Sequence, residues 1–523
     1  MRLVPAIIAV AFVFVLASAP RSAAAASPLN RPEDPVVLTG AAVPSLTGTM
    51  PGGIVAFRYS GGWQQIPVQI DERFVQNFST IYNNTPPPFS STNINELVYA
   101  DPNTYAGADP DPTFDSDDEL SFMAKDAGVA PPSFSEPAHV VHNSGVQLTI
   151  TDPLDSSAQG RVFLFKQDGA LDPGAGQSYV TYNFDLLSGN YKTTYDRATG
   201  PNPENTTVTT PYYAEHFGDR WQEDALQITA GGATGVDILD RHKALFAPGN
   251  CGRSEDTFDY YGGYPGPSNF PGEGAFIVNK SGPVRAIRAY LGANSGPNTE
   301  RVHIFYAQRQ DDTTYLRVHP IPSVMDFFDY SPAASGMTYY NSLNTSGVTI
   351  DGVPDAVTAG ATQWEMVTGA PGSLVMSGLF ATNIPSFAYT SYYEDNKTNP
   401  TTQCTGDAFA YGSSGAYVST SLPSTDPGLG STAFLDTTRV MYYEAPGLTT
   451  SDAAALDARA RAPLAVSSSA WAGGASVGGS AQIIDPATLP ARSSSHATLL
   501  ALLAGVVFAA VAGAVVLRAR GRG

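Results

Sequence analysis

Short runs of β-branched and aromatic residues recur through this chain, and each run ends at a cluster of Gly, Pro, Asn or Asp. With 50 Gly and 41 Pro the turn residues are frequent, whereas a helical period is convincing only over 451–461. The clearest runs are Gly53–Tyr59, Val146–Thr151, Arg161–Lys166, Val284–Leu291, Arg301–Arg309, Tyr315–Ile321 and Thr438–Tyr443. The pattern predicts an all-β protein, with an N-terminal β-sandwich or barrel domain followed by a larger antiparallel β-sandwich.

The two ends of the chain predict where the protein is located. Residues 1–26 combine Arg2, a short apolar run and an Ala-rich stretch, which is typical of a cleavable secretory signal peptide. Residues 497–517 carry no charge and are long enough to cross a bilayer, and the basic tail 518–523 should stay in the cytoplasm. We therefore expect an exported, single-pass membrane or cell-surface anchored protein with its N-terminal bulk outside. Leu489–Ser493 loosely resembles a bacterial surface-sorting motif, so the segment is either a transmembrane helix or a sorting tail.

Between these ends the sequence divides into two β-domains and a linker. The Pro-rich turn at 128–137 and the strand after it predict a first domain at 27–151 and a larger one at 152–463. Residues 464–496 are rich in Ser, Ala and Gly, which indicates a flexible linker that lifts the domains off the membrane. The formal net charge is -20, so a general nucleic-acid binder, which needs a basic face, is excluded.

Two cysteines, Cys251 and Cys404, lie in the part of the chain that we expect outside the cell. An even number of cysteines in an oxidising compartment predicts one disulfide between them. The alternative is that Cys251 is a thiol nucleophile, with His242 as the nearest histidine in the sequence. No spacing brings that pair together, so the disulfide is the favoured interpretation.

Three short segments resemble uncharacterised bacterial exported β-proteins. Residues 65–72 (QIPVQIDE) and 117–124 (DDELSFMA) are similar to a VPxQxD…DELxF pairing in an N-terminal β-domain, with Ile66 in the place of Val. Ser281–Arg285 (SGPVR) resembles the start of a strand in the β-supersandwich domains that follow this domain in proteins linked to polysaccharide breakdown. The resemblance implies a supersandwich of the polysaccharide-lyase-associated kind and a connection to glycans. It places no catalytic residue.

An acidic segment on a Pro-containing loop is a candidate cation site. Alternating carboxylates can converge their hard oxygen atoms, which are the ligands that calcium prefers, although the spacing is not that of an EF-hand. The candidate ligands are Asp109, Asp111, Asp115, Asp117 and Glu119. The alternative is a solvated acidic turn without a bound ion. We expect no other cofactor.

A run of basic residues in this acidic chain predicts a ligand-binding face. Residues 301–309 and 315–321 suit a hairpin around the polar loop 310–314, and the odd-numbered positions then share one face because cross-strand partners point the same way. The candidate residues are Arg301, His303, Arg309, Tyr315, Arg317 and His319. Arg can bind the carboxylate of an acidic sugar and His can move a proton near neutral pH. The alternative is structural pairing with carboxylates elsewhere.

These features favour a cell-surface-anchored extracellular protein that binds or processes glycans. Aromatic and acidic residues gather at 325–330 and 392–395, and such clusters suit the apolar faces and hydroxyl rims of sugar rings. One alternative is a structural or adhesive surface protein without catalytic activity, and another is a polysaccharide lyase-like enzyme that acts at the basic face. No metalloprotease, P-loop or dinucleotide-binding motif occurs, so the sequence leaves open whether the protein is an enzyme.

Overall fold

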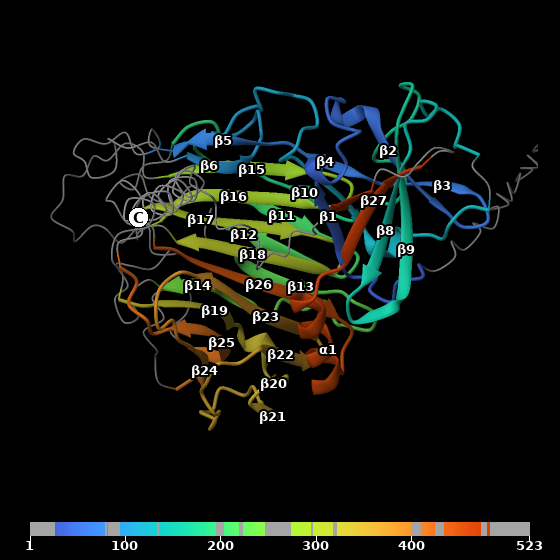
Figure 1. The fold of residues 1–523 in the computed structure, drawn as a ribbon. Helices are drawn as coiled ribbons and strands as arrows, with labels where there is room; N and C mark the ends of the chain where they lie inside the picture. Colours follow the sequence, from blue (N-terminus) through green and yellow to red (C-terminus); the bar gives the residue numbers. More distant parts are fainter. Residues whose placement is uncertain are drawn as a thin grey trace, which may run out of the picture.

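The computed structural model describes residues 27–78, 81, 95–132, 135–194, 203–218, 223–245, 274–293, 296–316, 322–398, 409–423, 433–471 and 478–481. Within these ranges the chain forms antiparallel β-sheets and a single α-helix (Figure 1). The prediction of an all-β protein is therefore confirmed. Short 3₁₀ helices lie at Gly40–Ala42, Pro51–Gly53, Ala124–Asp126 and Pro332–Ala334.

The centre of the molecule is a nine-stranded sheet in the order β15-β16-β17-β18-β26-β23-β22-β20-β21 (Figure 1). Its strands are β15 (Ala275–Ser281), β16 (Ala286–Ala293), β17 (Gly296–Phe305), β18 (Arg309–Leu316), β20 (Thr338–Asn341), β21 (Asn344–Thr349), β22 (Trp364–Gly369), β23 (Gly372–Thr382) and β26 (Leu435–Glu444). β18 is buried at every position although it includes Arg309, Asp311 and Asp312. A strand that is covered on both faces must satisfy such side chains inside the protein.

A second layer covers one face of this sheet and completes a β-sandwich. One of its sheets has the order β10-β11-β12-β13 and the other the order β14-β19-β25-β24. The strands are β10 (Thr181–Asn183), β11 (Thr206–Thr209), β12 (Tyr213–Phe217), β13 (Glu223–Ile228), β14 (Leu239–Leu245), β19 (Val324–Tyr330), β24 (Tyr389–Asn396) and β25 (Ala410–Val418). Side chains of both layers share one apolar core, in which the rings of Tyr213 and Tyr443 stack with centroids 3.9 Å apart. Burial of this surface holds the layers together.

The first part of the chain forms a smaller β-unit with its own core. A six-stranded sheet has the order β28-β27-β8-β9-β2-β3, a three-stranded sheet has the order β1-β7-β4, and β5 pairs with β6. The strands are β1 (Pro35–Thr39), β2 (Ile54–Tyr59), β3 (Trp63–Ile66), β4 (Gln69–Asp71), β5 (Arg73–Asn77), β6 (Asn95–Tyr99), β7 (Glu119–Met123), β8 (Val146–Asp152), β9 (Asp155–Lys166), β27 (Ala465–Ala470) and β28 (Gly478–Ala481). Leu38, Leu120 and Leu164 lie fully buried in the core between the two larger of these sheets.

The division of the chain differs from the predicted boundaries at 151/152 and 463/464. β8 and β9 form a hairpin across the first boundary, and β27 pairs with β8 along its whole length. β27 lies in the predicted flexible linker, yet Val466 is buried and the Ser468 hydroxyl donates to the carbonyl oxygen of Ala42 at 2.7 Å. Its small side chains suggested a spacer, but their alternating burial is that of a strand with one buried face. The smaller unit therefore includes β9 and β27.

The helix α1 (Thr450–Arg461) confirms the helical stretch predicted over 451–461. Its start is a capping box, in which Thr449 accepts a hydrogen bond from the amide of Asp452 and the Asp452 carboxylate accepts one from the amide of Thr449. The helix packs on the face of the nine-stranded sheet that lies away from the second layer. Its apolar contacts come from Ala453, Leu456 and Ala460.

The two units meet at a buried polar cluster, here named the joint, which consists of Gln69, Asp71, Glu119 and Arg285. Arg285 donates from Nε to Asp71 Oδ2 at 2.9 Å and from Nη2 to Glu119 Oε2 at 2.7 Å. Gln69 Oε1 accepts from the backbone amides of Val284 and Arg285 at 3.1 and 3.0 Å. All three segments that resemble exported β-proteins contribute to the joint, so they connect the smaller unit to the sandwich.

Charge pairing keeps the joint ionised although it is buried. Burial alone would raise the pKa of Asp71, but Lys280 and Arg285 lie close by and hold that pKa below its usual value. Burial would also raise the pKa of Glu119, and there Arg73 and Arg285 reverse the effect. Arg73 Nη1 donates to Glu119 Oε1 at 2.6 Å. The two carboxylates are therefore acceptors that depend on their basic partners.

Gly282, in the same segment as Arg285, allows the joint to close. A Cβ atom at this position would lie 2.1 Å from Gln69 Oε1, which is far inside van der Waals contact. That oxygen is the acceptor for the amides of Val284 and Arg285, so it has no room to withdraw without losing both hydrogen bonds. The position therefore needs a residue without a side chain because the two units approach each other so closely.

Several predictions concern residues outside the described ranges. The signal peptide at 1–26, the apolar segment at 497–517 and both cysteines, Cys251 and Cys404, belong to this part of the chain. Within the described ranges, no helix is both long and apolar enough to cross a membrane. Export, anchoring and the disulfide therefore stay predictions.

Candidate functional site

The hairpin that carries the predicted basic face has a different register from the one expected. β17 and β18 are joined by a tight turn, in which the amide of Tyr306 donates to the carbonyl oxygen of Arg309 at 2.8 Å. His303 consequently lies opposite Asp312. Residues 310–314, which were expected to be the loop, are the middle of a buried strand. The predicted pairing across that loop is wrong.

The observed register separates the predicted residues onto both faces of the sheet. Arg301 and His303 point toward the second layer, where Arg301 Nη2 lies 3.1 Å from Asp326 and the His303 ring packs against Phe217. Their cross-strand partners on β18 are Thr314 and Asp312. Arg309 and Tyr315 occupy positions of the opposite face, and Tyr315 packs in the apolar cluster beneath β5 and β6. The described residues therefore do not form the single face that the sequence predicted. Two further members of the predicted set lie outside the described ranges: Arg317 and His319.

Arg309 is engaged in structural ion pairs. Its Nε atom lies 2.7 Å from Asp311 Oδ1 and its Nη1 atom lies 3.0 Å from Asp34 Oδ1. Asp34 also binds Arg31 Nε at 2.5 Å, and all four side chains are buried. This chain of charges links the start of the smaller unit to the central sheet. The contacts of Arg309 are therefore those of structural pairing with carboxylates, which was the alternative to a ligand-binding role.

A row of charged side chains crosses the inner face of the nine-stranded sheet. Arg288, His303, Asp312 and Arg439 are cross-strand neighbours on β16, β17, β18 and β26. Each of them is at most 8% exposed. His303 Nδ1 lies 2.9 Å from Asp312 Oδ1, and two nitrogens of Arg288 bind the carboxylate of Glu204 at 2.7 and 3.0 Å. Because buried charges are costly unless they are paired, each residue of this row needs its charged partner inside the protein.

Asp326 of β19 faces this row from the second layer and accepts hydrogen bonds from three side chains. Its Oδ1 atom lies 2.7 Å from His242 Nε2 and 3.1 Å from Arg439 Nη1, and its Oδ2 atom lies 3.1 Å from Arg301 Nη2. Burial would raise the pKa of Asp326, but His242 and Arg301 hold it far below its usual value. Burial lowers the pKa of His242 to about 4, so the imidazole is neutral at pH 7. Asp326 is thus a fixed negative charge that orients its neighbours.

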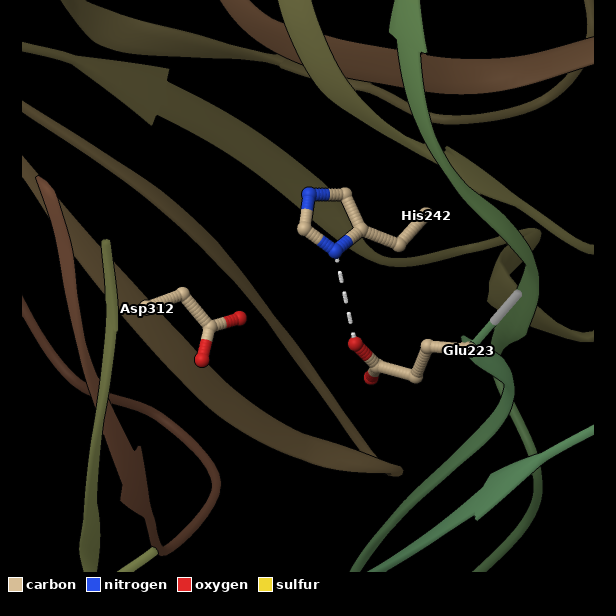
Figure 2. Close-up of side chains that lie close together, drawn as sticks. All are labelled: Glu223, His242 and Asp312. Carbon is tan, nitrogen blue, oxygen red and sulfur yellow. Dashed lines mark ion pairs between the residues drawn. The ribbon is translucent and has the colours of Figure 1, made fainter. Parts of the chain in front are cut away.

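Two further buried carboxylates lie beside His242, from Glu223 of β13 and Asp312 of β18 (Figure 2). Glu223 Oε2 lies 3.5 Å from His242 Nδ1, and one ligand atom of each of the three residues lies within 4.8 Å of the others. Neither carboxylate oxygen of Glu223 has a hydrogen-bond partner among the described residues. Burial raises the pKa of Glu223, and the charges of Glu215 and Asp312 raise it further. The side chains of Glu223, His242 and Asp312 therefore offer ligand atoms for a cation.

A pocket opens between the two layers next to Asp326. Its cavity volume is about 40 Å³. It therefore admits the edge of a ligand rather than a whole oligosaccharide. Asp326, Glu365 and Arg439 supply charged groups to its lining. Its aromatic residues are Trp364, Phe380 and Tyr389.

Glu365 of β22 and Asp326 give the pocket two carboxyl groups with different proton affinities. Burial raises the pKa of Glu365, and Arg439, whose Nη2 atom lies 4.0 Å from Glu365 Oε1, offsets this only in part. Asp326 by contrast is held ionised by its three donors. A carboxyl pair with separated pKa values can supply a proton donor and a base to one ligand. The pocket therefore has the groups that acid–base chemistry needs.

Sequence reasoning singled out Arg301 and His303 as candidate ligand-binding residues and the run 325–330, which contains Asp326, as a candidate sugar-binding cluster. It did not connect them with the other charged members of this region, which as a whole includes Glu223, His242, Asp312, Asp326, Glu365 and Arg439. They come from six different strands, so no local spacing connects them. The available signal was an acidic residue inside an otherwise apolar run, such as Asp326 within 325–330. The aromatic residues of that run, including Phe327, are core residues.

The acidic segment predicted to bind calcium forms a loop that ends at β7. Asp109, Asp111 and Asp115 each accept a hydrogen bond from the backbone amide two residues later. Burial, and then a hydrogen bond with Asp115, raises the pKa of Asp117 to about 6. Glu119 belongs to the joint, where it binds arginines, so its inclusion among the ligands is wrong. Calcium binding by the four aspartates stays a prediction.

Comparisons with known proteins add little to this geometry. No family model and no curated protein matches the chain. Nine chains of solved structures match, and among them is one described as "Crystal Structure Analysis of HI1317". It is 6% identical to this chain, covers 50% of this chain and 99% of its own, and has a TM-score of 0.25. This similarity establishes neither fold nor function.

Proposed function

We propose that the protein is an exported, surface-anchored β-protein that binds or processes glycans in the pocket between its two layers. The proposal includes the finer fold that the sequence suggested, a β-supersandwich of the polysaccharide-lyase-associated kind. The observation that supports it is the lining of the pocket, where aromatic rings and charged hydrogen-bonding groups share one hollow. Sugars need both, because their rings have apolar faces and their rims carry hydroxyl groups.

An uncharged sugar suits the charges of the pocket better than an acidic one. Arg439 is the basic residue of the lining, and its Nη1 atom already donates to Asp326 at 3.1 Å. An anionic sugar would compete with that carboxylate, and the chain as a whole carries a net charge of -20. Hydroxyl groups of a neutral sugar can instead donate to Asp326 and accept from Arg439.

Tyr389→Ala should weaken the binding of a neutral glycan about fivefold without unfolding the protein. Tyr389 is half-buried, and its hydroxyl donates to the carbonyl oxygen of Thr362 at 3.0 Å, which fixes the ring at the pocket. A well-placed aromatic contact is worth about 1 kcal/mol, which corresponds to about a fivefold change in affinity. The full-length protein in detergent would be screened on a glycan array, and Kd would then be measured by calorimetry.

Two variants serve as controls for this measurement. Tyr389→Phe keeps the ring but loses the hydrogen bond to Thr362, so its affinity should lie between those of the wild type and Tyr389→Ala. Phe409→Ala removes an exposed aromatic side chain that is not part of the pocket lining, and it should also leave binding unchanged. Equal losses in Tyr389→Ala and Phe409→Ala would contradict the pocket as the binding site. If the wild type bound no glycan, the structural or adhesive surface protein would be the better account.

Glycan cleavage is the second candidate function, and the unequal carboxyl pair favours it. Glu365 has a raised pKa and Asp326 a lowered one, and both line the pocket. Glu365 would donate a proton to the departing sugar oxygen, and Asp326 would stabilise positive charge or accept a proton. With a uronate-containing glycan, whose carboxylate makes the neighbouring C–H acidic, an unsaturated product with new ultraviolet absorbance would indicate a lyase-like elimination. New reducing ends without that absorbance would indicate hydrolysis.

If the protein cleaves a glycan, Glu365→Gln should lower kcat by about 10²–10⁴, because the amide has no acidic proton to donate. The wild-type rate should fall as pH rises through the raised pKa of Glu365, since only the protonated acid is active. Glu444→Gln is the matched control, because burial raises the pKa of Glu444 to about 7 at a site outside the pocket lining. A wild-type rate in Glu365→Gln would exclude Glu365 as the acid.

A further inference from the structure

The interior of the sandwich contains a convergent set of ligand atoms from both layers. Glu223 comes from β13 and His242 from β14, which are edge strands of the two different sheets of the second layer and contact each other. Asp312 comes from β18 of the facing sheet. In Figure 2 the carboxylate of Asp312 points toward the pair formed by the other two side chains. All three residues are exposed by 3% or less, and their ligand atoms lie within 4.8 Å of one another.

Each of the three side chains has at least one polar atom without a hydrogen-bond partner among the described residues. His242 Nε2 lies 2.7 Å from Asp326 Oδ1, whereas Nδ1 has no hydrogen-bond partner among the described residues. Asp312 Oδ1 accepts from Gln310 Nε2 at 3.0 Å, whereas Oδ2 has no such partner there. Both oxygens of Glu223 are likewise without one. A carboxylate on the far nitrogen is the usual support for a metal-binding histidine.

Carboxylates outnumber guanidinium groups around this cluster. Four carboxylates and two guanidinium groups influence one another in this part of the interior. The carboxylates belong to Glu215, Glu223, Asp312 and Asp326, and the guanidinium groups belong to Arg301 and Arg439. Buried carboxylates that outnumber their basic partners must be neutralised by protonation or by a bound cation.

We propose that Glu223, His242 and Asp312 bind a divalent transition-metal ion of the Zn²⁺ type. An imidazole ligand favours such an ion over Ca²⁺ or Mg²⁺, which prefer oxygen ligands alone. In a tetrahedral zinc site with bonds of about 2.0–2.1 Å the ligand atoms lie about 3.3 Å apart. His242 Nδ1 and Glu223 Oε2 are already 3.5 Å apart. Asp312 Oδ2 would supply the third bond, and the fourth position is left for water.

This inference does not rest on the proposed glycan function. The ion would lie behind the pocket, connected to it through Asp326, which lines the pocket and holds His242. It would also be distinct from the acidic loop for which the sequence predicts calcium. A metal measurement without any sugar therefore tests the cluster alone.

The test is the zinc content of the full-length protein after removal of metal with a chelator and reloading with ZnCl₂. We expect one Zn²⁺ per wild-type chain, and a Tm that rises with added Zn²⁺ because the ion binds only the folded state. Glu223→Gln keeps the shape of the side chain but should weaken zinc binding by about 100-fold or more. Substitution of a residue that only supports a ligand already lowers metal affinity by about 10–100-fold, and loss of a ligand should lower it at least as much. Co²⁺ in place of Zn²⁺ should give visible absorption bands of a four-coordinate site.

His142→Ala is the matched control, because its side chain is 82% exposed and lies in a turn ahead of β8, outside the cluster. It should bind zinc like the wild type. Asp312→Asn provides a second test of the cluster if Glu223→Gln fails to fold, as judged by circular dichroism. A folded wild type that binds no Zn²⁺ would overturn the proposal and indicate that Glu223 is protonated instead. Wild-type affinity in folded Glu223→Gln or Asp312→Asn would overturn it as well.

Discussion

Replacement of Arg285 by Met should lower the free energy of unfolding by about 3–5 kcal/mol, which is the cost of removing one partner from a buried ion pair. Arg285 is 1% exposed and binds Asp71 at 2.9 Å and Glu119 at 2.7 Å. Met fills much of the same volume but leaves two carboxylates with fewer partners in a dry joint. Lys280 and Arg73 would still offset part of their charge. Urea unfolding followed by tryptophan fluorescence would measure the loss.

The control for this experiment is a partly exposed ion pair of α1. Arg461 Nε lies 3.0 Å from Asp457, and the side chains of Arg461 and Asp457 are 35% and 7% exposed, so Arg461→Met should cost about 1.5–3 kcal/mol, the range for a hydrogen bond to a charged group. Combining Arg285→Met with Asp71→Asn and Glu119→Gln should recover part of the lost stability, because the buried charges are removed together. A loss in Arg285→Met no larger than in Arg461→Met would contradict the structural role of the joint.

Asp326→Asn should have a comparably large effect, again about 3–5 kcal/mol of unfolding free energy. The substitution keeps the shape of the side chain but removes the charge that Arg301, Arg439 and His242 share. One acceptor oxygen also becomes a donor, which then faces other donors. Because Asp326 lines the pocket, the variant should lose glycan binding together with stability. Thermal unfolding and calorimetry on the same sample would record both losses.

Asp224→Asn is the matched substitution at a more exposed pair. The Asp224 side chain is 21% exposed and pairs with His216 on β12, outside the pocket. We expect it to cost no more than about 1 kcal/mol and to leave binding unchanged. If Asp326→Asn were as mild as Asp224→Asn, the charged row in the sandwich interior would contribute little to stability.

Much of the architecture could be predicted from the sequence, because runs of β-branched and aromatic residues between turn residues indicate strands. The all-β class and the helix at 451–461 were predicted in this way and are confirmed. The hairpin of β17 and β18 was not, because residues 310–314 are polar and polar runs usually mark loops. Here the run lies between two covered faces, where Asp311 pairs with Arg309 and Asp312 with His303. Local composition shows only that residues 310–314 are polar, whereas their burial depends on the sheets that pack against β18.

The candidate site was largely invisible to sequence reasoning for the same reason. Arg301 and His303 stood out because they belong to a basic run, but their partner Asp312 was assigned to a loop. Glu223, His242 and Asp326 lie on three strands that only sheet pairing and layer stacking bring together. Metal-ligand motifs are recognisable in a sequence when one helix or loop supplies several ligands at fixed spacing. When each ligand lies on a different strand, the sequence contains no fixed spacing between ligands that would identify the site.

The position of β27 has a consequence for the order in which the protein is completed. β8 has β9 and β27 as its two neighbours, and β9 follows it at once, but β27 begins only at Ala465, after the whole sandwich. Synthesis from the N-terminus therefore leaves one side of β8 with unpaired backbone groups until the last described part of the chain has been made. Such an open edge can pair with other chains and aggregate. The unit that is made first is the one that is finished last, and the nascent protein is most vulnerable at that edge.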